Sequence, residues 1–387
     1  MKIIIFDGTF KTTTFINRLI EGLSLNHEVF VLGFNESVKS KITGVHYVGL
    51  GSNTSTLIFV LRSVKLRGFN FIKHFKLVIQ LSKGLKSEIS QDNFQLAIDA
   101  IQPDIIHFQW VSVLSYLENL KLPKCTKTIL SQRGFHINVR PFVNLDNMLF
   151  LKVAFQKLDG FHSVSKAIQK KSNEIYTSPS KIDHVIYSGF DYKHIPVREN
   201  TIFSKPIRII SVGRNHWKKD YRSAINAIYL LKNRGLNCHY TIIGVQKDEE
   251  LLFLVSELGL QKEITFSPRV TQEEVYNQML EADLFILPSV EEGIANVCIE
   301  AMFCKLLVLS TNCGGMSELI EDGITGFLVP TRAPDLMAQK IENIMQLSND
   351  KISEITMYAR EKVKQQHNSL KMITDMESLY KEVYERN

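Results

Sequence analysis

Short apolar runs alternate with helix-like patterns along the whole chain, and this alternation restricts the possible folds more than any other feature. A parallel strand buried on both faces is a nearly continuous apolar run, and a helix returns the chain to the start of the next strand. In the first half such runs occur at 3–6, 28–32, 46–48, 104–108, 128–130, 160–164 and 184–187. The sequence therefore predicts one helix-covered parallel sheet across roughly the first 190 residues.

The alternation stops once and then starts again. Residues 191–206 carry two prolines, mixed charges and no periodicity, which is typical of a linker. Apolar runs follow at 207–212, 240–243, 264–266, 284–287 and 306–309. We therefore predict an α/β chain of two Rossmann-like doubly wound domains, 1–195 and 196–367, which face each other across a cleft at the carboxyl ends of their strands.

The last stretch of the chain is helical by its apolar period. Ile373, Met376, Leu379 and Tyr380 are spaced for one face of a helix. The sequence does not decide on which domain this helix, at 368–387, packs. One option is that it completes the first domain.

Charge is distributed unevenly over a length that suits two domains. The 387 residues carry a net charge of +6, but residues 1–200 hold 25 basic and 15 acidic side chains, whereas 201–387 hold 21 and 25. A basic half joined to a mildly acidic half indicates two domains with different partners.

Several classes of protein are excluded. No apolar run reaches ~18 residues, so no membrane-spanning helix is expected. The first residues, MKIIIFD, are too short an apolar stretch for a secretory signal. Five cysteines without a CxxC pair do not indicate a zinc site and fit reduced thiols in a cytoplasmic protein.

The region 287–330 carries the richest chemistry. Glu292 lies in a loop after a buried strand, and Glu300 follows eight positions later on a helix that we expect to start near Asn296, a good N-cap residue. Gly314 and Gly315 follow the next strand, where backbone can approach a ligand closely. Two helix N-termini and a Gly-Gly loop around one point suit a diphosphate.

A basic cluster follows the first strand of the same domain. Gly213 permits a tight exit from the strand, Arg214 offers a planar fork to phosphate oxygens, and Lys219 adds a compact charge. A solvated basic loop is the alternative. The Glu292 to Glu300 segment in the same domain favours a phosphate site.

These motifs together resemble the retaining, nucleotide-sugar-dependent glycosyltransferases of family 4, which have the GT-B fold. Glu292 and Glu300 match the family's Glu-x7-Glu motif, and Gly213, Arg214 and Lys219 match its phosphate motif. Further matches are the Gly-Gly-x-x-Glu segment at Gly314, Gly315 and Glu318 and the turn at 322–326.

The resemblance implies a role for each matched residue. Glu300 would bind the ribose hydroxyls, and Glu292 would hold the transferred sugar with backbone N–H groups of the segment after it. Arg214 and Lys219 would neutralise the departing diphosphate in place of a metal ion, so no metal is expected. The nucleotide base would meet the backbone of the loop that follows residues 264–266. The donor-side residues so implied are Gly293, Ile294, Ala295, Asn296, Val297, Arg269 and Val270.

The resemblance also places the acceptor on the first domain. Gly8 lies in the loop after the first strand, which lacks the GxGxxG pattern of a nicotinamide site. His107 ends another strand, as a site residue or as a buried histidine with satisfied partners. Arg133 would bind an anionic acceptor or the donor phosphate.

Residues 61–86 are the most unusual stretch of the chain. Five Lys, two Arg and His74 interleave with large apolar residues. A basic amphipathic helix of this kind lies on an anionic membrane or packs its apolar face on its own sheet, and the sequence leaves both open. Nucleic-acid binding is not expected, because no recognised module accompanies the charge.

The function implied is transfer of a sugar, with retention of configuration, from a UDP- or GDP-linked donor to a glycan or a lipid-linked glycan. The expected setting is bacterial surface polysaccharide synthesis, in the cytoplasm or at the inner face of the membrane. A nucleotide-sugar epimerase of the same fold and a non-catalytic sugar-nucleotide-binding subunit remain as alternatives.

Overall fold

The computed structural model describes residues 1–34, 41–199 and 203–386, and these residues form two compact units. Unit 1 consists of Met1–Val164, Ile168–Phe190 and Ser369–Asn387, and unit 2 of Ser165–Ala167 and Asp191–Asn368. The chain therefore leaves unit 1 after Phe190 and returns to it at Ser369. The predicted linker at 191–206 begins at this division, and its residues 200–202 lie outside the described residues.

Unit 1 is built on a seven-stranded sheet in the order β3-β2-β1-β4-β5-β6-β7, and every pair of neighbours is parallel. The strands are β1 (Lys2–Gly8), β2 (Glu28–Gly33), β3 (Val45–Gly49), β4 (Ile105–Phe108), β5 (Lys127–Gln132), β6 (Gly160–Ser163) and β7 (Ile182–Val185). Its helical segments are α1 (Thr14–Leu23), α2 (Thr56–Arg67), α3 (Phe71–Ser82), α4 (Lys86–Ile101), η1 (Val111–Leu117), α5 (Phe135–Asn138), α6 (Arg140–Val143), α7 (Leu145–Phe155), α8 (Lys166–Ile175) and α16 (Ser369–Glu385).

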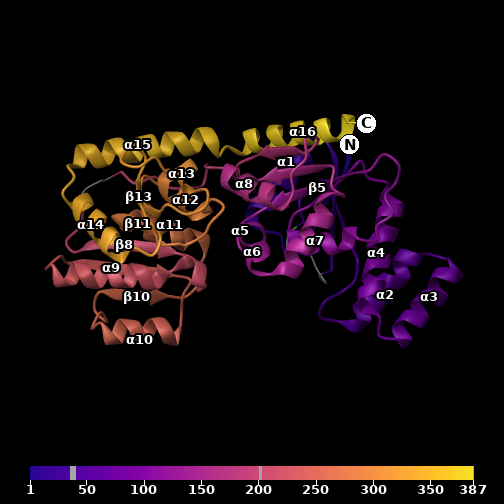
Figure 1. Ribbon diagram of the computed structural model, residues 1–387, viewed down its shortest axis with the longest axis horizontal. Helices are drawn as coiled ribbons and strands as arrows, with labels where there is room; N and C mark the ends of the chain where they lie inside the picture. The colour runs from indigo at the N-terminus through magenta and orange to yellow at the C-terminus, as the bar shows by residue number, and fades with distance from the viewer. Residues whose placement is uncertain (35–40, 200–202, 387) are drawn as a thin grey trace. The chain divides into compact units, whose positions relative to one another are not determined.

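Alternating side chains of β1 supply the two cores of unit 1. Successive residues of a strand point to opposite faces of the sheet. Ile3 and Ile5 belong to a core that includes residues of α1 and α16, whereas Ile4 and Phe6 belong to a core that includes residues of α4 and α7. Figure 1 shows α16 alongside α1, with which it is in contact. The unbroken apolar run of β1 is explained by this burial on both faces.

Unit 2 is built on a six-stranded parallel sheet in the order β10-β9-β8-β11-β12-β13. Its strands are β8 (Ile207–Val212), β9 (Cys238–Ile243), β10 (Ile264–Ser267), β11 (Leu284–Leu287), β12 (Leu307–Thr311) and β13 (Phe327–Val329). Its helical segments are η2 (Trp217–Lys219), α9 (Tyr221–Asn233), α10 (Glu249–Glu257), α11 (Gln272–Glu281), α12 (Asn296–Phe303), α13 (Met316–Leu319), α14 (Pro334–Met345) and α15 (Asn349–Gln366).

Local signals account for several element boundaries. Thr271 and Glu274 form the capping box that their spacing indicates: the Glu274 N–H donates to Thr271 Oγ1 at 3.2 Å, and the Thr271 N–H donates to Glu274 Oε2 at 2.8 Å. β13 was not predicted, because a three-residue apolar run after a turn does not stand out from the background.

We expected one helix in the basic stretch 61–86, but the structure has two, α2 and α3. Gly68 has a φ of 56°, which ends α2, and the Asn70 side chain accepts the Lys73 N–H at 3.0 Å, which starts α3. The stretch is therefore a helical hairpin with a defined tip.

Candidate functional site

The topological switch of unit 2 lies between β8 and β11. The chain continues from β8 to β9 on one side of the sheet and from β11 to β12 on the other. Parallel sheets bind ligands at such a point, outside the carboxyl ends of the strands. The loop after β8 holds Arg214 and Lys219, and the loop after β11 holds Glu292, so the fold brings the two predicted clusters to one edge.

An ion pair joins these two loops. Lys219 Nζ lies 2.7 Å from Glu292 Oε1, and both side chains are largely buried. Ser289 Oγ donates to the same carboxylate oxygen at 3.1 Å. The backbone repeats the connection, because the Val290 N–H donates to the Lys218 carbonyl at 2.7 Å. Within the described residues, Glu292 Oε2 has no hydrogen-bond partner.

Gly213 and Arg214 lie at the end of β8. The Tyr221 hydroxyl donates to the Gly213 carbonyl at 2.9 Å, and a Cβ at Gly213 would lie 2.9 Å from that hydroxyl. Burial, and then the Glu292 carboxylate, raises the pKa of Tyr221. Arg214 is exposed, and no partner for its guanidinium occurs among the residues that the structure describes.

Helix α12 begins at Asn296, with Ala295 as its N-cap, so Asn296 is the first helical residue and not the cap that we expected. Alanine has no oxygen to cap with, and no side chain caps this helix start. The uncapped first turn, Asn296 and Val297, follows Gly293, Ile294 and Ala295 directly.

Glu300 lies further along α12, where the Tyr276 hydroxyl donates to its Oε1 at 3.4 Å.

Gly314 and Gly315 have a packing role that their sequence pattern did not reveal. A Cβ at Gly314 would lie 1.7 Å from the Glu292 carbonyl oxygen, and one at Gly315 would lie 2.1 Å from that of Gly293. The Gly315 N–H also donates to the Glu292 carbonyl at 3.3 Å. The two glycines therefore let the loop after β12 support the loop that carries Glu292.

Two cysteines near these loops are not nucleophiles. Burial raises the pKa of the Cys313 thiol to about 12 and that of Cys298 well above its usual value. Both thiols therefore stay protonated at neutral pH. Only a thiolate is a reactive nucleophile, so neither cysteine is expected to act as one.

Arg269 and Val270 follow β10, which is an edge strand separated from β8 by β9. Arg269 is exposed and Val270 is half-buried. Their predicted contact with a nucleotide base stays a prediction.

In unit 1, Gly8 ends β1 at the corresponding switch point, because β1 lies between β2 and β4. Its φ of +84° is a conformation that favours glycine.

Arg133 follows β5, and its Nη2 donates to Gln109 Oε1 at 3.0 Å. Burial lowers the pKa of Arg133 to about 9. Its guanidinium carbon lies 4.4 Å from the centre of the Phe15 ring.

Of the two interpretations of His107, the structure supports the buried histidine with satisfied partners and not the site residue. It is fully buried, Nδ1 lies 2.7 Å from the Tyr380 hydroxyl, and Nε2 lies 2.8 Å from Ser131 Oγ. Burial, together with the neighbouring His162 and Arg133, lowers its pKa well below the usual value. A neutral histidine with both nitrogens occupied is part of the core and does not present itself to an acceptor.

Sequence reasoning missed Ser289 and Tyr276 as partners of the two glutamates. Ser289 had a usable signal, because it lies three residues before Glu292 in the same loop. Tyr276 had none, since it lies on α11 and reaches Glu300 only through the tertiary structure.

Metal clusters and membrane-spanning helices are both absent from the described residues. Among them, no three His, Cys, Asp or Glu side chains are grouped so that they could hold a metal ion. No helix in the described parts of the chain is long and apolar enough to cross a bilayer.

Comparison with known proteins agrees with this arrangement. Residues 196–362 match the sequence profile of the family described as "Glycosyl transferases group 1". WcaL of Escherichia coli (strain K12), a protein named as a colanic acid biosynthesis glycosyltransferase, is 31% identical over 198 residues. That alignment covers 49% of this chain and 49% of WcaL, so the match spans about half the length of this relative.

Two solved structures share the fold over the whole chain. Sucrose-phosphate synthase (tll1590) from Thermosynechococcus elongatus has a TM-score of 0.79 at 14% identity, with 100% of both chains covered. Anabaena Alr3699/HepE, in complex with UDP and glucose, has a TM-score of 0.72 at 16% identity, with 99% of this chain and 100% of that chain covered. The predicted fold class is confirmed: the chain has two Rossmann-like parallel-sheet units and shares the GT-B fold of these solved structures, and its residues 196–362 match the group 1 glycosyltransferase family.

Proposed function

We propose that this protein is a retaining glycosyltransferase that moves a sugar from a nucleotide-diphosphate sugar to a glycan or a lipid-linked glycan. The observation that carries the proposal is the Lys219–Glu292 pair at the switch point of unit 2, beside the exposed Arg214 and the uncapped start of α12. The colanic acid name of WcaL supports a role in bacterial surface polysaccharide synthesis.

The diphosphate is the group that the cations fit. An ammonium has three N–H donors, so Lys219 can keep its bond to Glu292 and still donate to phosphate oxygens. Arg214 adds a planar fork, and the first N–H groups of α12 add the positive end of a helix dipole. Charge builds on the diphosphate oxygens as the sugar leaves, and fixed donors lower the energy of that transition state most. This donor set replaces a metal ion in the proposal.

The two glutamates bind the remaining parts of the donor, the transferred sugar and the ribose. Glu292 has Oε1 committed to Lys219 and Ser289, which fixes the carboxylate and directs Oε2 to the hydroxyls of the transferred sugar. Glu300, on the second turn of α12, takes the ribose hydroxyls. An acceptor hydroxyl attacks the anomeric carbon on the face that the diphosphate leaves, and a diphosphate oxygen takes its proton. Configuration is thereby retained. The complex of HepE with UDP and glucose supports a UDP-linked donor, with GDP as the alternative.

The test begins with thermal shifts against a panel of UDP- and GDP-sugars, because a ligand at a hundred times its Kd stabilises a protein by ~2.7 kcal/mol. With the donor so found, we expect Arg214→Ala and Glu300→Ala each to lower turnover about a hundredfold, or ~3 kcal/mol in the barrier, while the fold survives. Arg234→Ala and Glu354→Ala are matched controls in unit 2, where Arg234 and Glu354 form surface ion pairs with Glu342 and Lys351.

The outcomes separate the alternatives. Turnover like that of the wild type in either site variant contradicts the site. Isomerised sugar nucleotide in the absence of acceptor identifies an epimerase. Donor binding without turnover under any acceptor identifies a non-catalytic subunit. The anomeric proton signal of the product reports retention or inversion directly.

A cytoplasmic setting belongs to the same proposal. All five cysteines are free, and four of them are buried. Thiols that stay unpaired fit a reducing compartment.

A further inference from the structure

The helical hairpin α2–α3 is the least explained element of unit 1. Figure 1 shows α2 and α3 side by side with α4, and all three pairs of these helices are in contact. Gly68, Phe69 and Asn70 form the tip between α2 and α3. Neither helix holds a residue assigned above to donor or acceptor.

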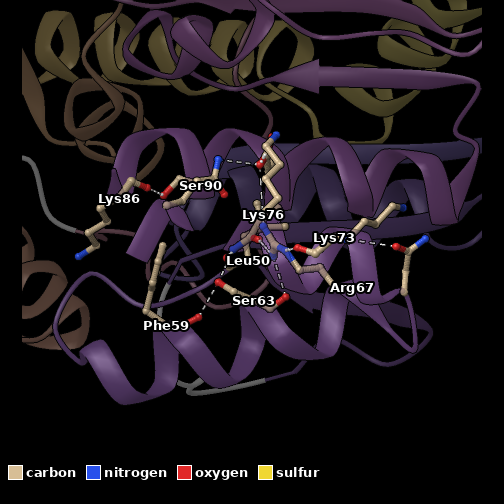
Figure 2. A network of polar contacts seen from close by, with 12 residues as sticks. Leu50, Phe59, Ser63, Arg67, Lys73, Lys76, Lys86 and Ser90 are labelled. Carbon is tan, nitrogen blue, oxygen red and sulfur yellow. Dashed lines mark hydrogen bonds and ion pairs between the residues drawn. The ribbon is translucent and has the colours of Figure 1, made fainter. Parts of the chain in front are cut away.

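A buried polar network fixes the two helix ends that flank the tip of this hairpin. Arg67 is buried, and its Nη1 donates to the Ser63 carbonyl and to Asn93 Oδ1, both at 2.7 Å. Its Nε donates to the Lys73 carbonyl at 3.2 Å, which ties the start of α3 to α2 (Figure 2). Asn93 Nδ2 donates in turn to the Leu50 carbonyl at 2.7 Å. The hairpin is therefore an ordered part of the fold.

The same hairpin leaves most of its apolar surface in solvent. It shares with α4 a small core of three residues, Phe59, Leu77 and Ile89, and the only buried residues of α3 are Leu77 and Gln80. Ten large apolar side chains are exposed instead: Leu57, Leu61, Val64, Phe69, Phe71, Ile72, Phe75, Val78, Ile79 and Leu81. Phe69 is 103% exposed, Phe71 90% and Ile72 82%, all at or beside the tip. Leu57, Leu61 and Val64 are spaced for one face of α2, and Phe71, Phe75 and Val78 for one face of α3. Exposed apolar faces of this kind mark an interaction site.

The charged side chains of the hairpin itself have one sign. The sequence has no Asp or Glu between Glu36 and Glu88, whereas Lys65, Lys73 and Lys83 are exposed on the hairpin. Lys76 is partly neutralised, because its Nζ lies 2.7 Å from Asp92 Oδ2. A second copy docked on the same face through a twofold axis would bring the cations of the two copies together. An anionic surface with an apolar interior meets both features.

We infer that the α2–α3 hairpin is a preformed membrane-docking element, whose apolar tip enters the interface of an anionic bilayer while its lysines contact the headgroups. At ~1.5 Å per residue, α3 is ~18 Å long, which suits a helix that lies in the interface and does not cross the bilayer. The inference rests on exposure and charge in unit 1 and does not depend on the proposed chemistry of unit 2. It excludes the alternative that the apolar face of 61–86 packs on its own sheet, because that face is exposed.

Flotation of the 387-residue chain with lipid vesicles tests the inference. We expect binding to phosphatidylcholine vesicles that contain about a third phosphatidylglycerol, weaker binding to phosphatidylcholine alone, and a loss between 50 and 500 mM NaCl. Phe71→Ser with Phe75→Ser should lower binding at least tenfold, and Lys73→Gln or Lys83→Gln about fivefold each. Phe253→Ser is the matched apolar control, because Phe253 on α10 is 68% exposed and Phe75 is 70% exposed. Lys371→Gln on α16 is the control for charge.

Four results would overturn the inference: no flotation at 50 mM salt, equal loss in the Phe253 control, insensitivity to the hairpin variants, or self-association that the hairpin variants abolish. The last result would assign the surface to a second copy. If the double phenylalanine variant unfolds, Phe69→Ser takes its place, since that side chain packs on nothing. Binding of a soluble sugar nucleotide is measured in parallel. It should not change, so failure here and failure of the proposed function are distinguishable.

Discussion

Asp7 is a buried carboxyl group at the end of β1, only 7% exposed, and it lies beside none of the predicted donor residues in the sequence. Burial raises its pKa to about 6, against the opposing effect of the Thr9 N–H, which donates to Oδ1 at 2.8 Å. The charged form is therefore costly in the folded state. Because the folded pKa is above the unfolded value of 3.8, this group makes folding less favourable as the pH rises from about 4 to about 6.

We expect Asp7→Asn to increase the free energy of unfolding of unit 1 by about 1–3 kcal/mol at pH 7.5, because the amide removes the buried charge and can still accept the Thr9 N–H. The gain should shrink as the pH falls towards 4. Urea unfolding at several pH values, followed by hydrogen exchange of the β1 amides, measures it. A gain that does not vary with pH would contradict the assignment to this carboxyl.

At the scale of an element, the turn between β12 and α13 is built for close contact. Gly314 has a φ of +49° and leaves no room for a Cβ, whereas Gly323 has a φ of +77° with nothing within 4 Å. An alanine would adopt a strained left-handed backbone at either position, but only at Gly314 would its Cβ collide with other atoms.

We expect Gly323→Ala to destabilise unit 2 by about 1 kcal/mol, the usual cost of a left-handed alanine. Gly314→Ala should cost more and should also weaken donor binding at least tenfold, because the added methyl group displaces the Glu292 backbone. Calorimetric binding of the donor nucleotide, beside the thermal midpoints, separates the two effects. Equal donor affinity in both variants would show that the Glu292 loop does not depend on this turn.

At the scale of the molecule, the last helix belongs to the first sheet. Met372, Met376, Leu379, Tyr380 and Val383 of α16 are buried in unit 1. A Cβ at Gly22 of α1 would lie 1.9 Å from Ile373 Cδ1, and one at Gly160 of β6 would lie 2.5 Å from Val383 Cγ2. Two glycines far apart in the sequence thus leave space for α16.

We expect Tyr380→Phe to destabilise unit 1 by about 1–3 kcal/mol, because His107 Nδ1 would be left buried without a partner. Tyr358→Phe, at an exposed position of α15, is the control and should change stability by less than about 0.5 kcal/mol. Hydrogen exchange of the β4 amides reports on the region around His107. Unchanged protection in Tyr380→Phe would mean that the hydroxyl contributes nothing to the attachment of α16.

Much of this fold follows from local pattern. Burial on both faces makes parallel strands apolar throughout, so the runs at 3–6, 207–212 and 284–287 coincide with strands. The capping box of α11 is equally local. β13 and the break at Gly68 escaped prediction, because a short run and a single glycine are weak signals until neighbouring elements pack on them.

The sequence by itself determined the two-sheet architecture and predicted a set of donor-side residues, because period and motif spacing are properties of a single chain segment. Only the tertiary structure decided which of those residues meet. It paired Lys219 with Glu292 across two loops that lie 73 positions apart, buried His107 between Tyr380 and Ser131, and left the phenylalanines at the tip of α3 in solvent. The physical reason is that pairing and burial depend on what the rest of the chain places opposite a side chain, and a local pattern does not contain that information.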